Sequence, residues 1–180
     1  MGNITNLTIQ LSKPTLSVSA KLKIICKAIK QLVPSADRVS LWAFTEQKSE
    51  IFCLMCLNEA NEFEFGQILK KNQFTPYFDY ILQNRILNAG DARTHTVTQC
   101  FTDSYFEPLN IHSLLDLIFH YDFVPTGVIC CEHTEQAIEW QESDITALQR
   151  IASLTTLFFA KDIAEIGLSQ SELTAALNQP

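Results

Sequence analysis

Apolar residues recur along the N-terminal part of the chain with the spacing of a helix. The residues at alternating intervals of four and three are Val18, Leu22, Ile25, Ile29 and Leu32. This spacing places them on one face of a helix, which Pro34 ends. Residues 1–14 precede it and close at a proline, so they are expected to be a flexible lead-in.

Two strands follow this helix. Residues 37–44 alternate and are rich in β-branched and aromatic side chains, which predicts a strand. Residues 51–57 predict its return strand, and they are apolar at both the odd and the even positions, so on both faces of the strand. A strand with no polar face is covered on both sides, so we expect layers above and below the sheet.

The middle and C-terminal parts combine short elements with a long apolar hairpin. Thr75 and Pro76 predict a helix start, with Thr75 as the N-cap and Pro76 at the first helical position. The other expected elements are a short strand at 67–74, a strand at 85–92, a broken short helix at 97–111, a strand hairpin at 113–133 and a long helix at 137–166. The last helix is apolar over two stripes, so it should pack on the sheet and on a second helix.

The order of these elements indicates the fold class. Helices bracket runs of hairpins, which favours an α+β layered domain over βαβ winding. A chain of 180 residues suits one domain with a real core. We therefore expect a single domain at residues 15–166, followed at 167–180 by a tail or an extension of the last helix.

The net charge of the chain bears on the kinds of partner that it can bind. The net charge is −7, and a nucleic-acid polymer is bound through a broad basic face, so no such partner is expected. A modest basic cluster of Lys21, Lys23, Lys27 and Lys30 lies on the first predicted helix. We interpret it as a solvated helix face.

Nothing in the sequence indicates a membrane or an export route. No apolar run approaches the ~20 residues that cross a bilayer. The N-terminus lacks the charged start and apolar stretch of a secretory signal. We therefore expect a cytoplasmic protein with no membrane partner, whose six cysteines are reduced.

Residues 127–133 read GVICCEH. This stretch could be a metal site, a redox site or a core strand that is rich in cysteine. Neighbouring side chains of a strand point to opposite faces, so Cys130 and Cys131 cannot share one metal. Cys53 and Cys56 have the spacing of a zinc knuckle, but their predicted strand also places the thiols on opposite faces. A working thiol needs a lowered pKa, and no Lys or Arg flanks these cysteines. We interpret them as buried structural residues and expect no metal site.

Several stretches, taken in order, resemble a GAF domain of bacterial signalling proteins. They are DRVSLW, NAGDAR, YFEPLNIHSLLD, GVICCEH and a tryptophan before an acidic helix start. The resemblance covers about residues 20–165. It implies a six-stranded antiparallel sheet, with the terminal helices on one face and a small-molecule pocket under short helices on the other.

Two chemically active branches of that family fit the sequence poorly. One branch is a thiol reductase of free methionine sulfoxide, with loop cysteines in a Gly-rich context that this chain lacks. Another attaches a bilin covalently, and Cys100 lies in the corresponding neighbourhood without the usual Cys-His pairing. No catalytic residue, metal or cofactor is assigned.

Strand alternation and the resemblance together give the candidate pocket. Ser40, Trp42 and Phe44 share a face whose polar and aromatic mixture is typical of pockets. We expect the pocket on that face and not on the face of Val39 and Leu41. The candidate ligand-binding residues are Ser40, Trp42, Phe74, Thr75, Asp91, Phe101, Tyr105, Ser113 and Leu115.

These features favour a sensory domain that binds a small organic molecule or a nucleotide and has no catalysis of its own. A ligand-free dimerisation module whose pocket is filled by its own aromatics remains open, as does a thiol-based reductase. A homodimer through the terminal helices is expected because both helices carry apolar residues beyond one sheet-facing stripe. The residues of this predicted dimer seam are Val18, Leu22, Ile25, Ile29, Ile151, Leu154 and Phe158.

Overall fold

The computed structural model describes residues 3–165, which form an α+β domain. Its elements are α1 (Asn3–Leu11), α2 (Val18–Leu32), β1 (Arg38–Phe44), β2 (Glu50–Leu57), β3 (Phe63–Glu64), β4 (Ile68–Lys70), α3 (Thr75–Ile81), β5 (Ile86–Ala89), η1 (Gln99–Phe101), η2 (Thr102–Phe106), β6 (Ile111–Tyr121), β7 (Val124–Thr134), α4 (Glu142–Phe158) and α5 (Ala160–Glu165). The expected tail at 167–180 lies outside the described residues.

One antiparallel sheet organises the domain. Its strand order is β3-β2-β1-β7-β6-β5, and β4 pairs with β2 beside this path. The sheet thus has seven strands where the resemblance implied six, the extra one being the three-residue β4. The predicted α+β class and the antiparallel sheet are confirmed.

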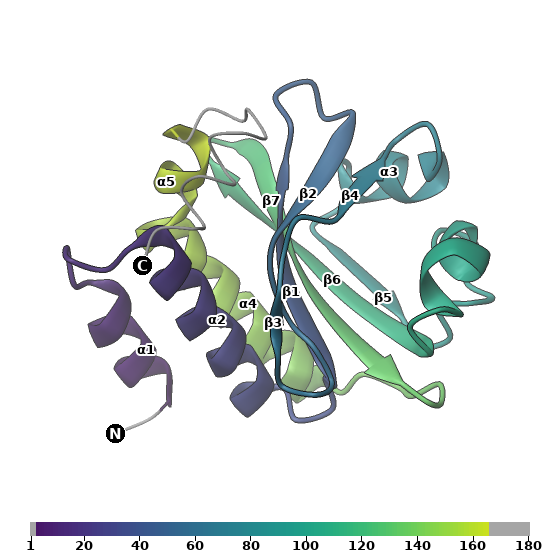
Figure 1. The fold of residues 1–180 in the computed structure, drawn as a ribbon, viewed down its shortest axis with the longest axis horizontal. Coiled ribbons are helices and arrows are strands. Elements are labelled where there is room, and N and C mark those ends of the chain that lie inside the picture. The colour runs from purple at the N-terminus through teal and green to yellow at the C-terminus, as the bar shows by residue number, and fades with distance from the viewer. Residues whose placement is uncertain (1–2, 166–180) are drawn as a thin grey trace.

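Both faces of the sheet are buried, as the apolar pattern of residues 51–57 predicted. Helices α2, α4 and α5 cover one face, called the helix-covered face below, and α1 packs on the outer side of α2 and α4 (Figure 1). The other face is covered by α3 and the η1–η2 segment. Val39 and Leu41 pack under the terminal helices, whereas Trp42 and Phe44 pack under the short helices. The predicted orientation of the first strand is therefore confirmed.

The N-terminal lead-in was predicted wrongly. Residues 3–11 form α1, and its Leu7 and Leu11 are buried in the core of the helix-covered face. Ser17 then caps α2 by accepting a hydrogen bond from the Ala20 amide at 3.2 Å. The short α1 depends on tertiary packing, because a nine-residue helix is marginal on its own.

Two other helix boundaries differ from expectation. Phe74, not Thr75, occupies the N-cap of α3, and no side chain caps that helix. The last helix begins at Glu142, where Gln141 and Asp144 form a capping box, instead of at residue 137. It breaks at Phe159, and α5 continues from Ala160.

A β-bulge in β2 changes which side chains share a face. Leu41 pairs with Met55 and Trp42 with Cys53, so the register shifts by one residue between them. Leu54 and Met55 both pack on the helix-covered face, while Cys53 and Cys56 both pack on the other. The prediction that the two thiols point to opposite faces was wrong, because alternation fails at a bulge. For Cys130 and Cys131 the strand is regular, and the predicted opposite faces are confirmed.

The apolar residues of the predicted dimer seam are largely buried within the chain. Leu22, Ile25, Ile29 and Ile151 are all 0% exposed, and Leu154 and Phe158 are partly buried against the same core. These residues pack α1, α2 and α4 on one another and on the sheet. The observation that motivated the dimer is thereby corrected: the helices bury this surface themselves.

This burial predicts the effect of a charge on α4. Replacing Ile151 with Glu should lower the free energy of unfolding by at least about 3 kcal/mol, because it buries an unpaired carboxylate in a packed core. Gln149→Glu places the same charge on an exposed position of the same helix and should change it by less than about 0.5 kcal/mol. Urea unfolding of the two variants measures both. A folded Ile151→Glu protein with native stability would contradict the packing of α4.

Candidate functional site

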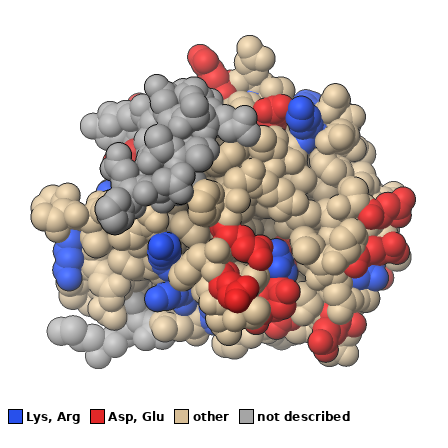
Figure 2. Space-filling view, viewed as in Figure 1, with Lys and Arg blue, Asp and Glu red and all other residues tan. Residues whose placement is uncertain are grey.

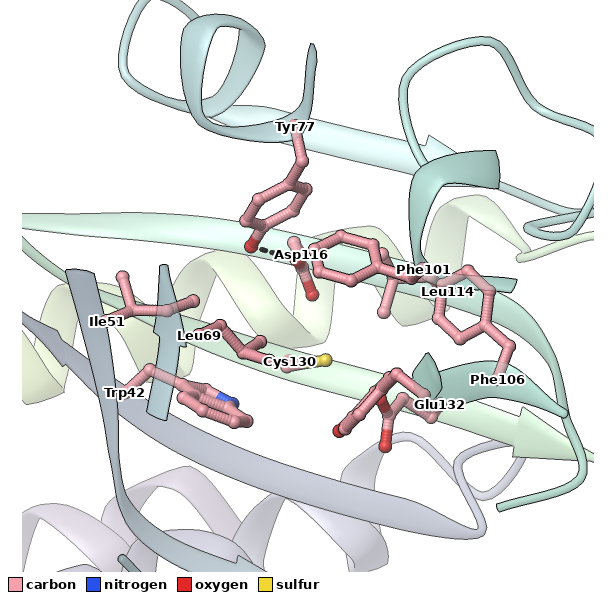
Figure 3. Close-up of a pocket in the computed structure, with 11 residues that line it drawn as sticks. Trp42, Ile51, Leu69, Tyr77, Phe101, Phe106, Leu114, Asp116, Cys130 and Glu132 are labelled. Atoms are coloured by element: carbon pink, nitrogen blue, oxygen red, sulfur yellow. Dashed lines mark hydrogen bonds between the residues drawn. The ribbon is translucent and has the colours of Figure 1, made fainter. Parts of the chain in front are cut away.

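A small cavity lies between the sheet and the layer of α3, η1 and η2 (Figure 3). Its lining residues are Trp42, Ile51, Leu69, Tyr77, Phe101, Tyr105, Phe106, Leu114, Asp116, Cys130 and Glu132. Its volume is about 20 Å³, which holds roughly one water molecule. The side chains of the protein therefore fill most of the space on this face.

Aromatic rings make up the cover of the cavity. Phe101 of η1 is central to them: its ring stacks on Phe74 at 4.3 Å between centroids and meets Tyr77 edge-on at 4.9 Å. The rings of Tyr105 and Phe106 lie within 6.1 Å and 5.6 Å of the same ring. Offset and edge-on contacts of this kind add to the stability that burial provides, so they hold α3, η1 and η2 together as one layer.

Asp116 lies under this layer, in the middle of β6. It is 2% exposed, and the Tyr77 hydroxyl donates a hydrogen bond of 2.6 Å to its Oδ2 (Figure 3). Burial raises the pKa of Asp116 to about 7, although the Cys130 thiol and the Tyr77 hydroxyl act to lower it. Among residues 3–165, Oδ1 has no hydrogen-bond partner.

Glu132 lies two residues beyond Cys130 on β7 and is 1% exposed. Arg38 Nε, on the neighbouring strand β1, donates to its Oε2 at 3.3 Å. Burial raises the pKa of Glu132, while the charge of Arg38 and the Tyr105 hydroxyl oppose that shift. Its second oxygen, Oε1, has no hydrogen-bond partner within the described residues.

Arg38 connects the cavity to a second void nearer the surface. Its guanidinium also donates to Glu59 at 2.6 Å and lies 3.8 Å from a carboxylate oxygen of Glu64. Burial acts to lower the pKa of Arg38, but Glu132 and its other neighbours raise it above its ordinary value, so the side chain stays charged. The second void has a volume of about 90 Å³ and shares Trp42 and Tyr105 with the inner cavity.

Five of the residues predicted for the pocket lie at or next to it. Trp42, Phe101 and Tyr105 line the cavity. Ser40 is buried behind Trp42 and accepts a hydrogen bond of 2.8 Å from its indole nitrogen. Phe74 stacks on Phe101 from outside the lining.

The other four predicted residues do not reach the cavity. Thr75 is exposed and donates its hydroxyl to the Lys71 carbonyl, and Asp91 is an exposed loop residue. Ser113 is buried, where it donates to the Gly90 carbonyl at 2.6 Å and accepts from the Ile138 amide at 2.8 Å.

Leu115, the last of them, packs in the core under the terminal helices. Its neighbours Leu114 and Asp116 face the cavity instead. The choice of Ser113 and Leu115 was thus wrong by one residue, which in a strand means the wrong face.

Three central residues of the site were not predicted from the sequence: Tyr77, Asp116 and Glu132. The sequence did carry a signal for the two acids. Asp116 stands inside SLLDLIF and Glu132 inside VICCEH, and an acid within an apolar strand is buried unless it lies at an edge. Only the pairing of Asp116 with Cys130 shows that the two share one face of neighbouring strands.

The thiols of the chain are poor nucleophiles in this structure. All six cysteines are free, and burial raises the pKa of each of them, to about 12 in Cys56. The thiolate is the reactive form, so these environments act against thiol chemistry. Within residues 3–165, no group of three or more His, Cys, Asp or Glu side chains could hold a metal ion.

Three lysines of α2 make contacts within the domain. Lys30 donates to the Asn58 carbonyl at 2.6 Å, and the ammonium groups of Lys23 and Lys27 lie within 5.8 Å of the Phe63 ring centre. On the face drawn in Figure 2, acidic side chains gather near the centre and along one edge, and the described residues form no continuous basic surface there. No helix within residues 3–165 is both long and apolar enough to cross a bilayer.

Comparison with known families gives one match. The family model described as "GAF domain" matches residues 18–157, a range that includes the sheet, the aromatic layer and nearly all of α4. No curated protein sequence matches the chain.

Solved structures with the same fold are numerous, and each of the following three is distant in sequence. The GAF domain of an Acinetobacter phosphoenolpyruvate-protein phosphotransferase has 14% identity and a TM-score of 0.69, over 91% of this chain and 94% of that one. The corresponding domain from Coxiella burnetii has 16% identity and a TM-score of 0.66, over 91% and 96%. The phycoerythrobilin-bound GAF domain of a cyanobacterial phytochrome has 14% identity and a TM-score of 0.73, over 91% and 95%. Identities this low establish a shared fold.

The buried Asp116 predicts a pH dependence of stability. Its pKa is about 7 in the folded protein and about 4 when unfolded, so the folded state holds an extra proton between these values. This bound proton stabilises the folded state at low pH. As the pH rises, the free energy of unfolding should fall, by up to about 1.4 kcal/mol per pH unit between pH 5 and 7. Asp116→Asn cannot titrate and should lack this slope, whereas the exposed control Asp103→Asn should keep it.

Urea unfolding of wild type and both variants at pH 5, 6, 7 and 8 measures the difference. Wild type and Asp116→Asn with parallel pH profiles would show that Asp116 is ionised throughout, and that its environment is wetter than the structure indicates.

Proposed function

The chain belongs to the GAF domain family, and from this we propose that it is a sensory and regulatory domain of a signal-transduction protein that binds a small molecule under α3, η1 and η2. The observation that carries the proposal is the pair of buried carboxylates, Asp116 and Glu132, whose free oxygens line one cavity. Buried polar atoms in folded proteins nearly always have a partner. Two unpartnered carboxylate oxygens in one cavity are accounted for by a molecule that binds there.

The size of the cavity bears on the kind of ligand. The GAF domain of the phytochrome relative is bound to a bilin, but the inner cavity of this chain, at about 20 Å³, holds only about one water molecule. An organic ligand would therefore have to occupy part of the second void as well, or displace a ring of the aromatic layer. Cys100 is half-buried on η1 and has a raised pKa, which does not favour covalent attachment. We propose a compact ligand that extends toward the second void, with Trp42 and Tyr105 between the two spaces.

Regulation without catalysis fits the chemistry of the site. Burial keeps the six thiols protonated, and Asp116 and Glu132 are each engaged by one neighbour, Tyr77 and Arg38. A cytoplasmic location is part of the proposal and is supported by the six free cysteines.

The two tryptophans provide a test. Trp42 lines the cavity, whereas Trp140 is buried on the helix-covered face. A Trp140→Phe variant therefore reports on the cavity alone, and Trp42→Phe is its matched control. Small molecules released by heat from natively purified protein, identified by mass spectrometry and added back, should change the emission of Trp140→Phe but not of Trp42→Phe. They should also raise the melting temperature, because a ligand of the native state stabilises it.

The absence of any released molecule from natively purified protein, together with no response of Trp42, would contradict ligand binding. A response carried by Trp140 alone would place the ligand on the wrong face of the sheet.

A second candidate is a ligand-free dimerisation module, which the near-filled cavity favours. It requires a homodimer through the terminal helices, where Ile9 of α1 and Leu157 of α4 are 50% and 71% exposed. This candidate predicts that the protein sediments as a dimer at about 100 micromolar, well above the dissociation constants of stable interfaces. Leu157→Glu should then give a folded monomer. Wild-type protein that is monomeric at this concentration would rule the module out.

A further inference from the structure

Two buried carboxylate oxygens of the inner cavity have no hydrogen-bond partner among the described residues, and both are acceptors when the acids are ionised. They are Asp116 Oδ1 and Glu132 Oε1. Two donors in the lining are already used, since the Tyr77 hydroxyl donates to Asp116 and the Trp42 indole to Ser40. The Tyr105 hydroxyl and the Cys130 thiol lie close enough to act on the pKa values of the two acids, but neither forms a hydrogen bond of good geometry with Oδ1 or Oε1. A ligand that satisfies this cavity must therefore bring N–H or O–H groups of its own.

The charges around the cavity have one sign in excess. Arg38 lines the second void and reaches the inner cavity through Glu132, and it already contacts the carboxylates of Glu132, Glu59 and Glu64. Glu59 and Glu64 are more than half exposed, so their charge is screened by solvent, and Arg38 balances the buried Glu132. Asp116 is then the buried acid of the cavity that has no cationic partner. A phosphate or carboxylate ligand would add like charge in a buried site, whereas a cation would offset it.

The aromatic lining of the cavity also favours a cationic ligand. Trp42, Tyr77, Phe101, Tyr105 and Phe106 line the cavity together with the two acids. The faces of aromatic rings attract cations, and they do so more strongly where water is excluded. Carboxylates and aromatic rings together form the kind of enclosure in which an organic cation is favoured over a neutral molecule of equal shape.

The strand register suits a ligand with several donors. Asp116 is directly opposite Cys130, and Glu132 is two residues further along β7, so the two acids are diagonal neighbours on one face. The Cβ atoms of such neighbours lie about 7 Å apart, a separation that a planar group with two nitrogen donors can bridge.

We infer that the cavity selects a small organic cation of the amidinium or guanidinium class, held between Asp116 Oδ1 and Glu132 Oε1. This inference rests on the proposed function and specifies its ligand. A metal ion is a poorer fit, because within the described residues no group of three metal-ligating side chains exists. Any larger part of the ligand extends past Tyr105 toward Gln67 in the second void.

Three isosteric probes test the charge requirement directly: acetamidinium, acetamide and acetate share one shape and carry charges of +1, 0 and −1. Each is titrated into 15N-labelled protein at pH 7.5 and constant ionic strength. Acetamidinium should give saturable shifts at cavity residues, while the other two give none at the same concentration. Four heavy atoms limit its dissociation constant to about tens of micromolar at best, so the titration extends to ~50 mM.

Matched variants locate the binding. Asp116→Asn and Glu132→Gln keep the shape of the side chain and should each weaken acetamidinium at least about tenfold. Glu59→Gln removes another carboxylate partner of Arg38 outside the inner cavity and should leave the affinity within about twofold. Variant spectra with native dispersion confirm that folding is retained, and Asp116→Asn serves alone where Glu132→Gln unfolds.

Each other outcome overturns the inference in a recognisable way. Equal binding of acetamide or acetate would leave a ligand site without selection for cations. Saturable shifts with Mg²⁺, Ca²⁺ or Zn²⁺ that block acetamidinium would assign a metal. No binding of any probe, while a released molecule still changes Trp42 emission, would refute the cation and keep the proposed function. No binding and no Trp42 response would leave only buried water at the two acids and refute both.

Discussion

Two carboxylates, Asp116 and Glu132, are buried on one face of a sheet that has no solvent-exposed side. Removing charged groups from water is costly unless they are paired, hydrogen-bonded or neutralised. The structure meets this constraint only in part. Tyr77 and Arg38 each satisfy one oxygen, burial raises both carboxyl pKa values, and one oxygen of each acid remains unpartnered among the described residues.

The same constraint connects the cavity to the frame of the domain. Tyr77 comes from α3, so the aromatic layer is joined to β6 by a buried hydrogen bond as well as by packing. Arg38 begins β1 directly after Asp37, which accepts hydrogen bonds from Thr134 and lies 3.0 Å from His133. The residues at the start of β1 and at the end of β7 therefore have two roles. They hold a buried acid of the cavity, and they form the junction between α2 and the sheet.

The sequence predicted the architecture well and the site poorly, for a physical reason. Periodicity reports which faces are apolar, and it gave the α+β class and the orientation of Trp42 correctly. It also predicted correctly that GVICCEH is a core strand. A side chain at Gly127 of this strand would collide with the Trp42 carbonyl and the Phe119 ring. Alternation is blind to a bulge, which brought Cys53 and Cys56 to one face. It was also applied one residue out of phase at Ser113 and Leu115, and so missed Asp116. Which acids meet across strands depends on register, which a single sequence does not specify.

The content of the cavity decides whether Asp116 and Glu132 bind an organic cation. A high-resolution crystal structure of protein purified without denaturation should show density between Asp116 Oδ1 and Glu132 Oε1. We expect a planar group larger than a water molecule, with nitrogen atoms about 2.8 Å from both oxygens, as charge-assisted hydrogen bonds require. A single water molecule bound to both carboxylates, or carboxylates turned away to protein partners, would contradict this expectation.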